Sequence, residues 1–306
     1  RQRTRERKER SRTMGRNKAK KSRKANYKSS MGREVWHRLK KNRLAMVGLF
    51  ILAMVVLIAI FAPVIAPHGY DDQNAADALS FPCWKYPFGT DNFGRDILSR
   101  MIYGSRITLL VGASAVTVSA AIGCTLGIIA GFYKKTENWI MRTMDIIGGI
   151  PYLLLAIAIG AALGSGLTNM VLAVALSAIP GYARIARASV LTVKECEYIE
   201  AAHCIGSGNF HIVWRHILPN SVSPMVVQAT IGAANAVLSA SCLSFMGLGI
   251  QPPSPEWGAM LSYGRTFIRD QWYMCLIPGL ALMIVVYALN TLGDGLRDAM
   301  DPHLKN

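Results

Sequence analysis

The 306-residue sequence lacks the motifs that an enzyme or an ATP-using protein needs. It has no glycine-rich Walker loop ending in Gly-Lys-Ser or Gly-Lys-Thr, and no Cys-x-x-Cys or His-Glu-x-x-His metal pattern. Its long apolar runs also lack a histidine that could serve as a catalytic base. The six histidines all lie in polar segments: His37, His68, His203, His211, His216 and His303. The sequence therefore predicts neither enzyme activity nor a cofactor or metal bound by this chain.

Charged side chains are nearly absent from the same apolar runs. Asp145, near one end of the third run, is the exception. An ion- or proton-coupled carrier needs titratable groups inside the bilayer, so this class of transporter is disfavoured. If the chain moves a solute against a gradient, the energy has to come from a partner protein.

Acidic residues are scarce, with 18 Asp and Glu against 34 Lys and Arg and a net charge of +16. The excess is confined to the first 43 residues, which hold 19 basic residues and three acids. Because large apolar residues are almost missing before Val35, we expect residues 1–34 to form a disordered basic tail. Beside a membrane span such a tail is attracted to anionic lipid, so we predict lipid contacts and no nucleic-acid partner.

What the sequence does contain is a series of long apolar runs. The first, Leu44–Ala66, has 23 uncharged residues, enough at about 1.5 Å per residue to cross a hydrocarbon core of roughly 30 Å. Five more are expected at Ile107–Phe132, Met144–Leu163, Leu167–Ala183, Ser221–Ile250 and Met274–Leu292. The sequence thus predicts an all-α polytopic membrane protein with six transmembrane helices.

Polar segments between the apolar runs divide the chain further. Residues 35–66 are read as a surface segment and the first span, and residues 67–106 as an external loop that turns into a short helix. A core domain then covers residues 107–302, with a polar turn at residues 133–143 and a short tail at 303–306. Pro151 should kink the third span, and Pro180-Gly181 should loosen the end of the fourth.

Glycines recur at four-residue intervals in the second span, at Gly123, Gly127 and Gly131. This spacing puts them on one helix face, where the missing side chains let another helix approach closely. We expect this face to be a helix-packing ridge.

The stretch between the fourth and fifth spans is polar and reads as helix, turn and helix. Tyr198–Ile205 forms the first helix, and Gly206 ends it because glycine accepts positive φ. Asn209 is positioned to cap the second helix, and Pro219 should end it. A polar helical hairpin next to membrane spans indicates a docking surface.

Six residues of this hairpin carry a resemblance to a known family: Glu200, Ala201, Ala202, Gly206, Leu218 and Pro219. Together they resemble the Glu-Ala-Ala loop of ABC importer permeases, through which the membrane subunit grips its ATPase. One position departs from the usual pattern, because His216 stands where isoleucine is common, with Ile217 next to it. The resemblance implies a cytoplasmic coupling hairpin at residues 188–219.

Three further blocks, Tyr86–Arg106, Gly247–Gly258 and Gly293–Pro302, are similar to the C-type permease subunits of dipeptide and oligopeptide transporters. The similarity covers residues 35–302 and implies the type I ABC importer permease fold. It also implies a related permease as partner, two ATP-binding subunits that hold ATP and Mg, and an extracytoplasmic substrate-binding protein. Peptides are the implied substrate, with nickel complexes and glutathione left open. The alternative to this function is a channel-like or scaffold membrane protein outside the ABC class.

Small and neutral residues on the fifth span form a candidate wall of the translocation path: Gly232, Ala233, Asn235, Ala236, Ser239 and Ser241. Such a wall offers no counter-charge, so we expect it to discriminate weakly between acidic and basic peptides. The alternative is that these residues only pack helices together.

Orientation follows from the basic residues. With the N-terminus inside, the inside segments carry 28 Lys and Arg and the outside segments six, or nine against six without the first 43 residues. The positive-inside rule therefore predicts that both termini of this multi-pass protein are cytoplasmic. The implied location is the cytoplasmic membrane of a bacterium or archaeon.

Overall fold

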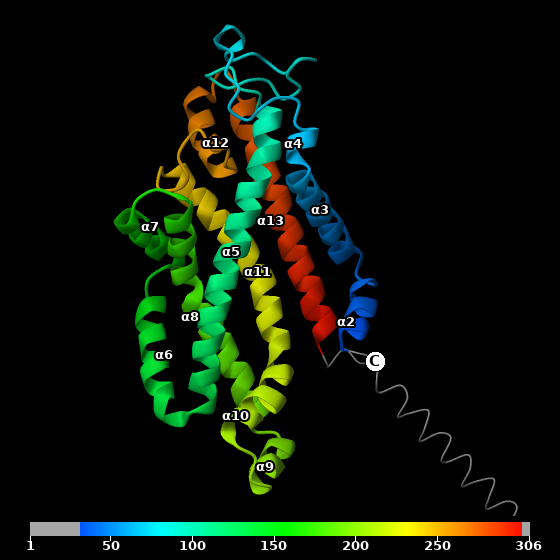
Figure 1. Cartoon of the computed structure of the whole chain (residues 1–306), viewed down its shortest axis with the longest axis vertical. Helices are drawn as coiled ribbons and strands as arrows, with labels where there is room; N and C mark the ends of the chain where they lie inside the picture. Colours follow the sequence, from blue (N-terminus) through cyan, green and yellow to red (C-terminus); the bar gives the residue numbers. More distant parts are fainter. Residues whose placement is uncertain (1–30, 302–306) are drawn as a thin grey trace, which may run out of the picture.

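The structure is a computed structural model that describes residues 31–301. This part of the chain is built from helices, with no β-strand in it. Figure 1 shows an elongated bundle in which α5 runs along most of the length. The segment before α5 and helix α12 lie at one end, and the α9–α10 region lies at the other.

The N-terminal part consists of α2 (Met31–Leu39), α3 (Arg43–Ile60) and the short α4 (Ala62–Ile65). Helix α3 begins where the side chain of Asn42 accepts a hydrogen bond from the Ala45 amide at 3.2 Å. It begins where the first predicted span begins but ends at Ile60, and the last part of that predicted span, Leu44–Ala66, forms the separate α4. Residues 31–34, expected to be part of a disordered tail, are helical in α2, whereas residues 1–30 lie outside the described part of the chain.

Helix α5 (Ile97–Phe132) is longer than the predicted second span. It begins ten residues earlier because the carboxylate of Asp96 accepts hydrogen bonds from the amides of Leu98 (3.3 Å) and Ser99 (2.9 Å). The loop expected at residues 67–106 therefore ends at Asp96, and the short helix expected there is continuous with the span.

Helices α6 (Lys134–Gly148) and α7 (Tyr152–Leu163) correct the expected polar turn at residues 133–143, which is helical. The two helices meet at an angle of 86° across Gly149–Pro151. Pro151 lacks an amide hydrogen and disfavours helical geometry in the residue before it, so a break stands where the sequence predicted a kink.

The remaining long helices are α8 (Leu167–Lys194), α11 (Leu218–Phe245) and α13 (Tyr273–Met300), with the short α12 (Trp257–Gly264) between the last two. Helix α8 continues through the buried Pro180 without the loosened end that the sequence predicted. Within residues 31–301, five helical stretches are long and apolar enough to cross a membrane, and the bent pair α6–α7 makes a sixth. The expectation of six spans holds when that pair is counted as one.

The tightest helix pairing joins α5 and α8. A Cβ atom on Gly123 would lie 2.6 Å from Cβ of Tyr182, and one on Gly131 would lie 2.8 Å from Cβ of Val190. Between them, Gly127 packs against Ala186 in the same way. The glycine ridge brings the backbone of α5 directly against α8, so these two helices are packed closely together along their length.

Candidate functional site

Of the hairpin predicted at residues 188–219, residues 188–194 belong to α8 and residues 218–219 to α11. The polar hairpin between these helices, residues 195–217, consists of α9 (Glu197–Cys204), α10 (Asn209–Ile212) and η2 (Val213–Ile217). Its turn is a Schellman motif: the Ser207 amide donates to the Ala202 carbonyl at 3.1 Å and the Gly206 amide donates to the His203 carbonyl at 3.0 Å. Gly206 has φ of +80°, and a Cβ atom there would meet open space. The glycine is therefore required by backbone conformation and not by crowding.

A compact apolar cluster fixes the hairpin to the long helices. Ile199 and Ala202 of α9 pack with Ile212 and Ile217, against Phe132 at the end of α5 and Val190 of α8. Ala202, one of the residues that carry the resemblance, is buried because it belongs to this cluster. The cluster therefore joins the hairpin to both α5 and α8.

The opposite face of the hairpin is exposed and apolar. Ile205 and Phe210 are about four-fifths exposed, at 81% and 79%, and Trp214 is 64% exposed. The rings of Phe210 and Trp214 stack with an interplanar angle of 6°. Sequence reasoning missed this face, although the four-residue spacing of the two aromatic residues on one helix was the signal for it.

Glu200 and Ala201 lie on the exposed side of α9. Among the described residues, none forms an ion pair or hydrogen bond with the Glu200 carboxylate. The hairpin thus presents an unpaired carboxylate and two exposed aromatic rings, a combination that suits contact with another protein.

Two expectations for the second half of the hairpin were wrong. Asn209 does not cap α10, because the N-cap position is held by Gly208 without a side-chain hydrogen bond. Pro219 does not end the helix, which continues from Asn209 to Phe245. The π-helical η2, in which the Leu218 amide donates to the Val213 carbonyl, precedes the proline. Pro219 occupies the first turn of α11, where its missing amide hydrogen costs little.

The structure separates the residues of the candidate path. Ala236, Ser239 and Ser241 are buried inside this chain, with exposed fractions of 3 to 6%. Gly232 and Ala233 are half-buried, and the added Cβ of Gly232 would meet the hydroxyl of Tyr182. Asn235 is exposed on the outside of α11 together with Leu238.

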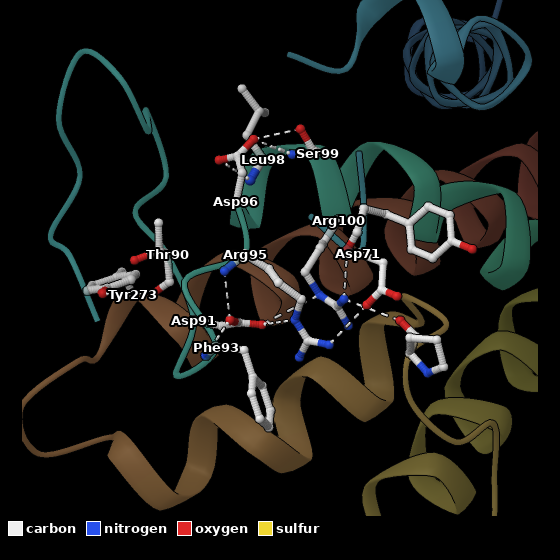
Figure 2. A network of polar contacts seen from close by, with 12 residues as sticks. Asp71, Thr90, Asp91, Phe93, Arg95, Asp96, Leu98, Ser99, Arg100 and Tyr273 are labelled. Carbon is white, nitrogen blue, oxygen red and sulfur yellow. Dashed lines mark hydrogen bonds and ion pairs between the residues drawn. The ribbon is translucent and has the colours of Figure 1, made fainter. Parts of the chain in front are cut away.

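A second group of charged residues lies at the other end of the bundle (Figure 2). Arg95 donates to the Asp91 carboxylate at 2.7 Å, and the same carboxylate lies 3.8 Å from the guanidinium of Arg100. Arg100 also donates to the carbonyls of Tyr70 (2.9 Å) and Pro253 (3.3 Å). Both arginines are buried, so this network fastens the connecting segment, residues 67–96, to α5 and to the loop before α12.

Glu256 is a third buried acid of this region beside Asp91 and Asp96, with 1% exposure. Its carboxylate caps α12 by accepting from the amides of Gly258 (2.9 Å) and Ala259 (2.8 Å). Burial raises the pKa of this carboxyl above its ordinary value. Together with the arginine network it gives this end of the molecule a structural role, and the described residues include no group of His, Cys, Asp and Glu arranged to hold a metal ion.

Two family models match the chain. Residues 123–306 match the binding-protein-dependent transport system inner membrane component, and residues 30–82 match the N-terminal TM domain of oligopeptide transport permease C. The first match includes the polar hairpin, and the second includes α2 to α4.

Curated relatives agree with these matches. The chain is 47% identical to the dipeptide transport system permease protein DppC of Alkalihalophilus pseudofirmus, over 90% of each chain. It is 43% identical to the glutathione transport system permease protein GsiD of Escherichia coli, over 89% of this chain and 90% of the relative.

Solved structures show the same fold at lower identity. Two inward-facing crystal forms of the MetNI methionine ABC transporter align with TM-scores of 0.55 and 0.57 at 19% identity. They cover 66 and 67% of this chain and 96 and 98% of the matched chains. The fold is therefore that of type I ABC importer permeases. With the family model covering more than half of the sequence, the chain belongs to the family of binding-protein-dependent transport system inner membrane components.

Proposed function

We propose that the chain is the membrane-spanning permease subunit of an ATP-driven importer of short peptides. The relatives named for dipeptides and for glutathione, itself a small peptide, support this substrate class. The family assignment argues against the channel-like or scaffold alternative. By the positive-inside rule, both termini and the polar hairpin lie in the cytoplasm of a bacterium or archaeon.

The observation that carries the proposal is the two-sided character of the polar hairpin. Its inner face is fixed to α5 and α8 through Ile199, Ile212 and Ile217. Its outer side exposes the rings of Phe210 and Trp214 and the carboxylate of Glu200. Exposed aromatic residues gathered on one face are typical of the centre of a protein interface. An ATP-binding subunit docked there would move α5 and α8 when it closes on ATP and Mg.

Glu200 would supply the polar contact of this interface. A charge-assisted hydrogen bond to a basic group of the ATP-binding subunit contributes about 1.5 to 3 kcal/mol, against about 0 to 1 kcal/mol for an exposed surface pair. Because the carboxylate has no partner among the described residues, it is free to accept such a bond.

The pathway itself would form between this chain and a related permease, with an external binding protein delivering the peptide. In the candidate wall, Asn235 is the exposed polar side chain. Gly232 and Ala233 are small, so no bulky side chain projects from these two positions of α11. Ala236, Ser239 and Ser241 would support that wall from behind, since they are buried. A neutral wall of this kind suits peptides of differing charge.

The test is transport by the complete complex reconstituted in vesicles with its binding protein and a labelled dipeptide. Glu200→Ala should lower ATP-driven uptake at least about tenfold, the effect of losing roughly 1.4 kcal/mol of interface energy. Glu197→Ala removes an exposed carboxylate from the same helix and serves as the control, with uptake close to that of the unaltered chain. Normal uptake by the Glu200 variant would remove the coupling role of the hairpin.

A further inference from the structure

A basic pocket lies between the polar hairpin and the turn that joins α5 to α6. It is open and has a volume of about 480 Å³. Its lining comes from three places in the sequence: Phe132, Tyr133, Lys134, Lys135, Thr136, Lys194, His203 and Asn209. Since one water takes up about 30 Å³ in the liquid, the pocket has room for a phosphate group with part of its hydration shell.

The charge of this pocket is of one sign. Three lysines line it, and none of its described lining residues is acidic. Glu137, the acid nearest in sequence to Lys134 and Lys135, is held in an ion pair by Arg187 of α8. The positive charge at the pocket is therefore not neutralised by that carboxylate.

One of the lysines is held in place by the fold. The ammonium of Lys194 donates to the Phe132 carbonyl at 2.8 Å and lies 5.5 Å from the centroid of the Phe132 ring. This contact uses one of three N–H donors, so two remain for a ligand. Asn209 also lines the pocket and adds a neutral N–H donor, whereas the hydroxyl of Thr136 donates to the Tyr133 carbonyl at 3.0 Å. Ammonium and amide N–H donors around one space suit a phosphate oxygen shell.

The position of the pocket at the end of α5 places it at the membrane surface. Helix α5 carries no charged residue from Ile107 to Phe132, a stretch of 26 residues in the sequence. At about 1.5 Å per residue this stretch is roughly 39 Å long, whereas the hydrocarbon core is about 30 Å thick and the whole bilayer about 40 to 45 Å. Lys134 and Lys135 directly after it therefore reach the level of the lipid headgroups.

We propose that this pocket binds the phosphate of an anionic phospholipid headgroup, bridging the α5–α6 turn and the polar hairpin. Basic pockets at the cytoplasmic side of membrane helices attract such headgroups. The exposed rings of Phe210 and Trp214 are not part of the pocket lining, so lipid and protein would use different faces of the hairpin. That the lipid acts on transport rests on the proposed function, whereas the binding itself does not.

The experiment measures phospholipid retained by the purified full complex in native mass spectrometry, after extraction from nanodiscs of phosphatidylglycerol with phosphatidylcholine. The double variant Lys134→Gln/Lys135→Gln should bind phosphatidylglycerol roughly thirtyfold more weakly, because each of the two bases near the surface contributes about 1 kcal/mol. Arg142→Gln is the matched control, since it removes an exposed positive charge from α6 outside the pocket. It should bind phosphatidylglycerol like the unaltered chain, and Lys134→Arg/Lys135→Arg should retain binding.

A second arm separates the sources of phosphate. Millimolar inorganic phosphate added to the same complex should leave bound phosphatidylglycerol unchanged, and its displacement of the lipid would assign the site to free phosphate and overturn the lipid as ligand. Equal phosphatidylglycerol binding by the double variant, the control and the unaltered chain would overturn the site. So would loss of the ATP-binding subunits from the double variant with lipid binding intact, which would assign the lysines to an acidic protein surface. Because lipid binding is read without ATP, a failure of the coupling role at Glu200 leaves this test standing.

Discussion

The two ends of the bundle treat charged and apolar groups in opposite ways. In the connecting segment, Asp91 and Arg95 are buried and bonded to each other inside the chain. In the polar hairpin, Phe210 and Trp214 are exposed and Glu200 faces solvent. A buried charge is costly unless a partner inside the protein pairs with it. An exposed aromatic ring stabilises the molecule only when another surface covers it. The arginine network of the first end is therefore paired within this chain, whereas the exposed face of the hairpin is the surface that we propose for a partner.

The largest effect should come from breaking the self-contained end. Arg100→Ala removes two hydrogen bonds to carbonyls and leaves the Asp91 carboxylate buried with one cationic partner fewer. We expect the free energy of unfolding to fall by about 3 to 5 kcal/mol, the range for removing one member of a buried charged group. Thermal unfolding of the purified protein in detergent measures it. Arg269→Ala, at an exposed position, should change stability by no more than about 0.5 kcal/mol, and a similar value for Arg100→Ala would contradict a structural network.

The exposed end should give the reverse pattern. Trp214→Ala should leave the stability of the chain within about 0.5 kcal/mol, because the ring is exposed. Its affinity for the ATP-binding subunits should nevertheless fall by about 2 kcal/mol, or roughly thirtyfold. Binding of the subunits to immobilised permease measures this. Trp139→Ala on α6, where the ring is 79% exposed, is the control and should bind normally. Equal losses in both variants would mean that the rings contact lipid instead.

A backbone change probes the shape of the same end. Gly206→Val places a β-branched residue at φ of +80° with no neighbour within 4 Å of the new Cβ, so any effect comes from the turn itself. The strain of about 1 to 2 kcal/mol should shift the turn away from its left-handed form by about five- to thirtyfold and reduce peptide uptake accordingly. Gly208→Val, where φ is −66° and the space is also open, should preserve uptake. If both variants transport alike, the exact turn is not needed for docking.

The smallest effect concerns the tip of the connecting segment. Hydrogen bonds from Lys85 and Tyr86 hold the pKa of Asp77 below its ordinary value of about 4. A depressed carboxyl pKa adds stability above the unfolded value and loses it as the pH falls through the folded value. The protection of residues 75–90 against hydrogen exchange, relative to the intrinsic rate at each pH, should therefore fall slightly below about pH 4 in the unaltered chain. In Asp77→Asn the protection should lack this pH step, and an identical step in both proteins would assign it to another group.

The polar hairpin shows how far the sequence could be read. Gly206 was predicted to take positive φ, and it does, because glycine alone adopts this region at no steric cost. Pro219 was expected to end the helix. Instead, the π-helical η2 precedes the proline, and the helix continues into α11. Local propensity could not foresee this, since Ile212 and Ile217 are both drawn into the cluster around Val190 and hold the helix together.

The connecting segment also contains contacts that could not be predicted from the sequence. Arg95 and Arg100 were expected in a loop without a catalytic role, but nothing in the sequence paired them with Asp91 and with the carbonyl of Pro253, which is 153 residues away from Arg100. A contact over such a distance depends on how α5 and the loop before α12 are packed. Burial of a charge is decided by these neighbours and not by the residue type.

By itself, the sequence determined the membrane class, the apolar spans, the glycine ridge and the place of the polar hairpin, because each depends on composition or on spacing along one helix. Only the tertiary structure decided that α6 and α7 meet at 86°, that Ala236 and Ser239 face inward while Asn235 faces outward, and that the hairpin has one anchored and one exposed face. The physical reason is that a helix has several faces, and which of them is covered depends on neighbours that are distant in the sequence.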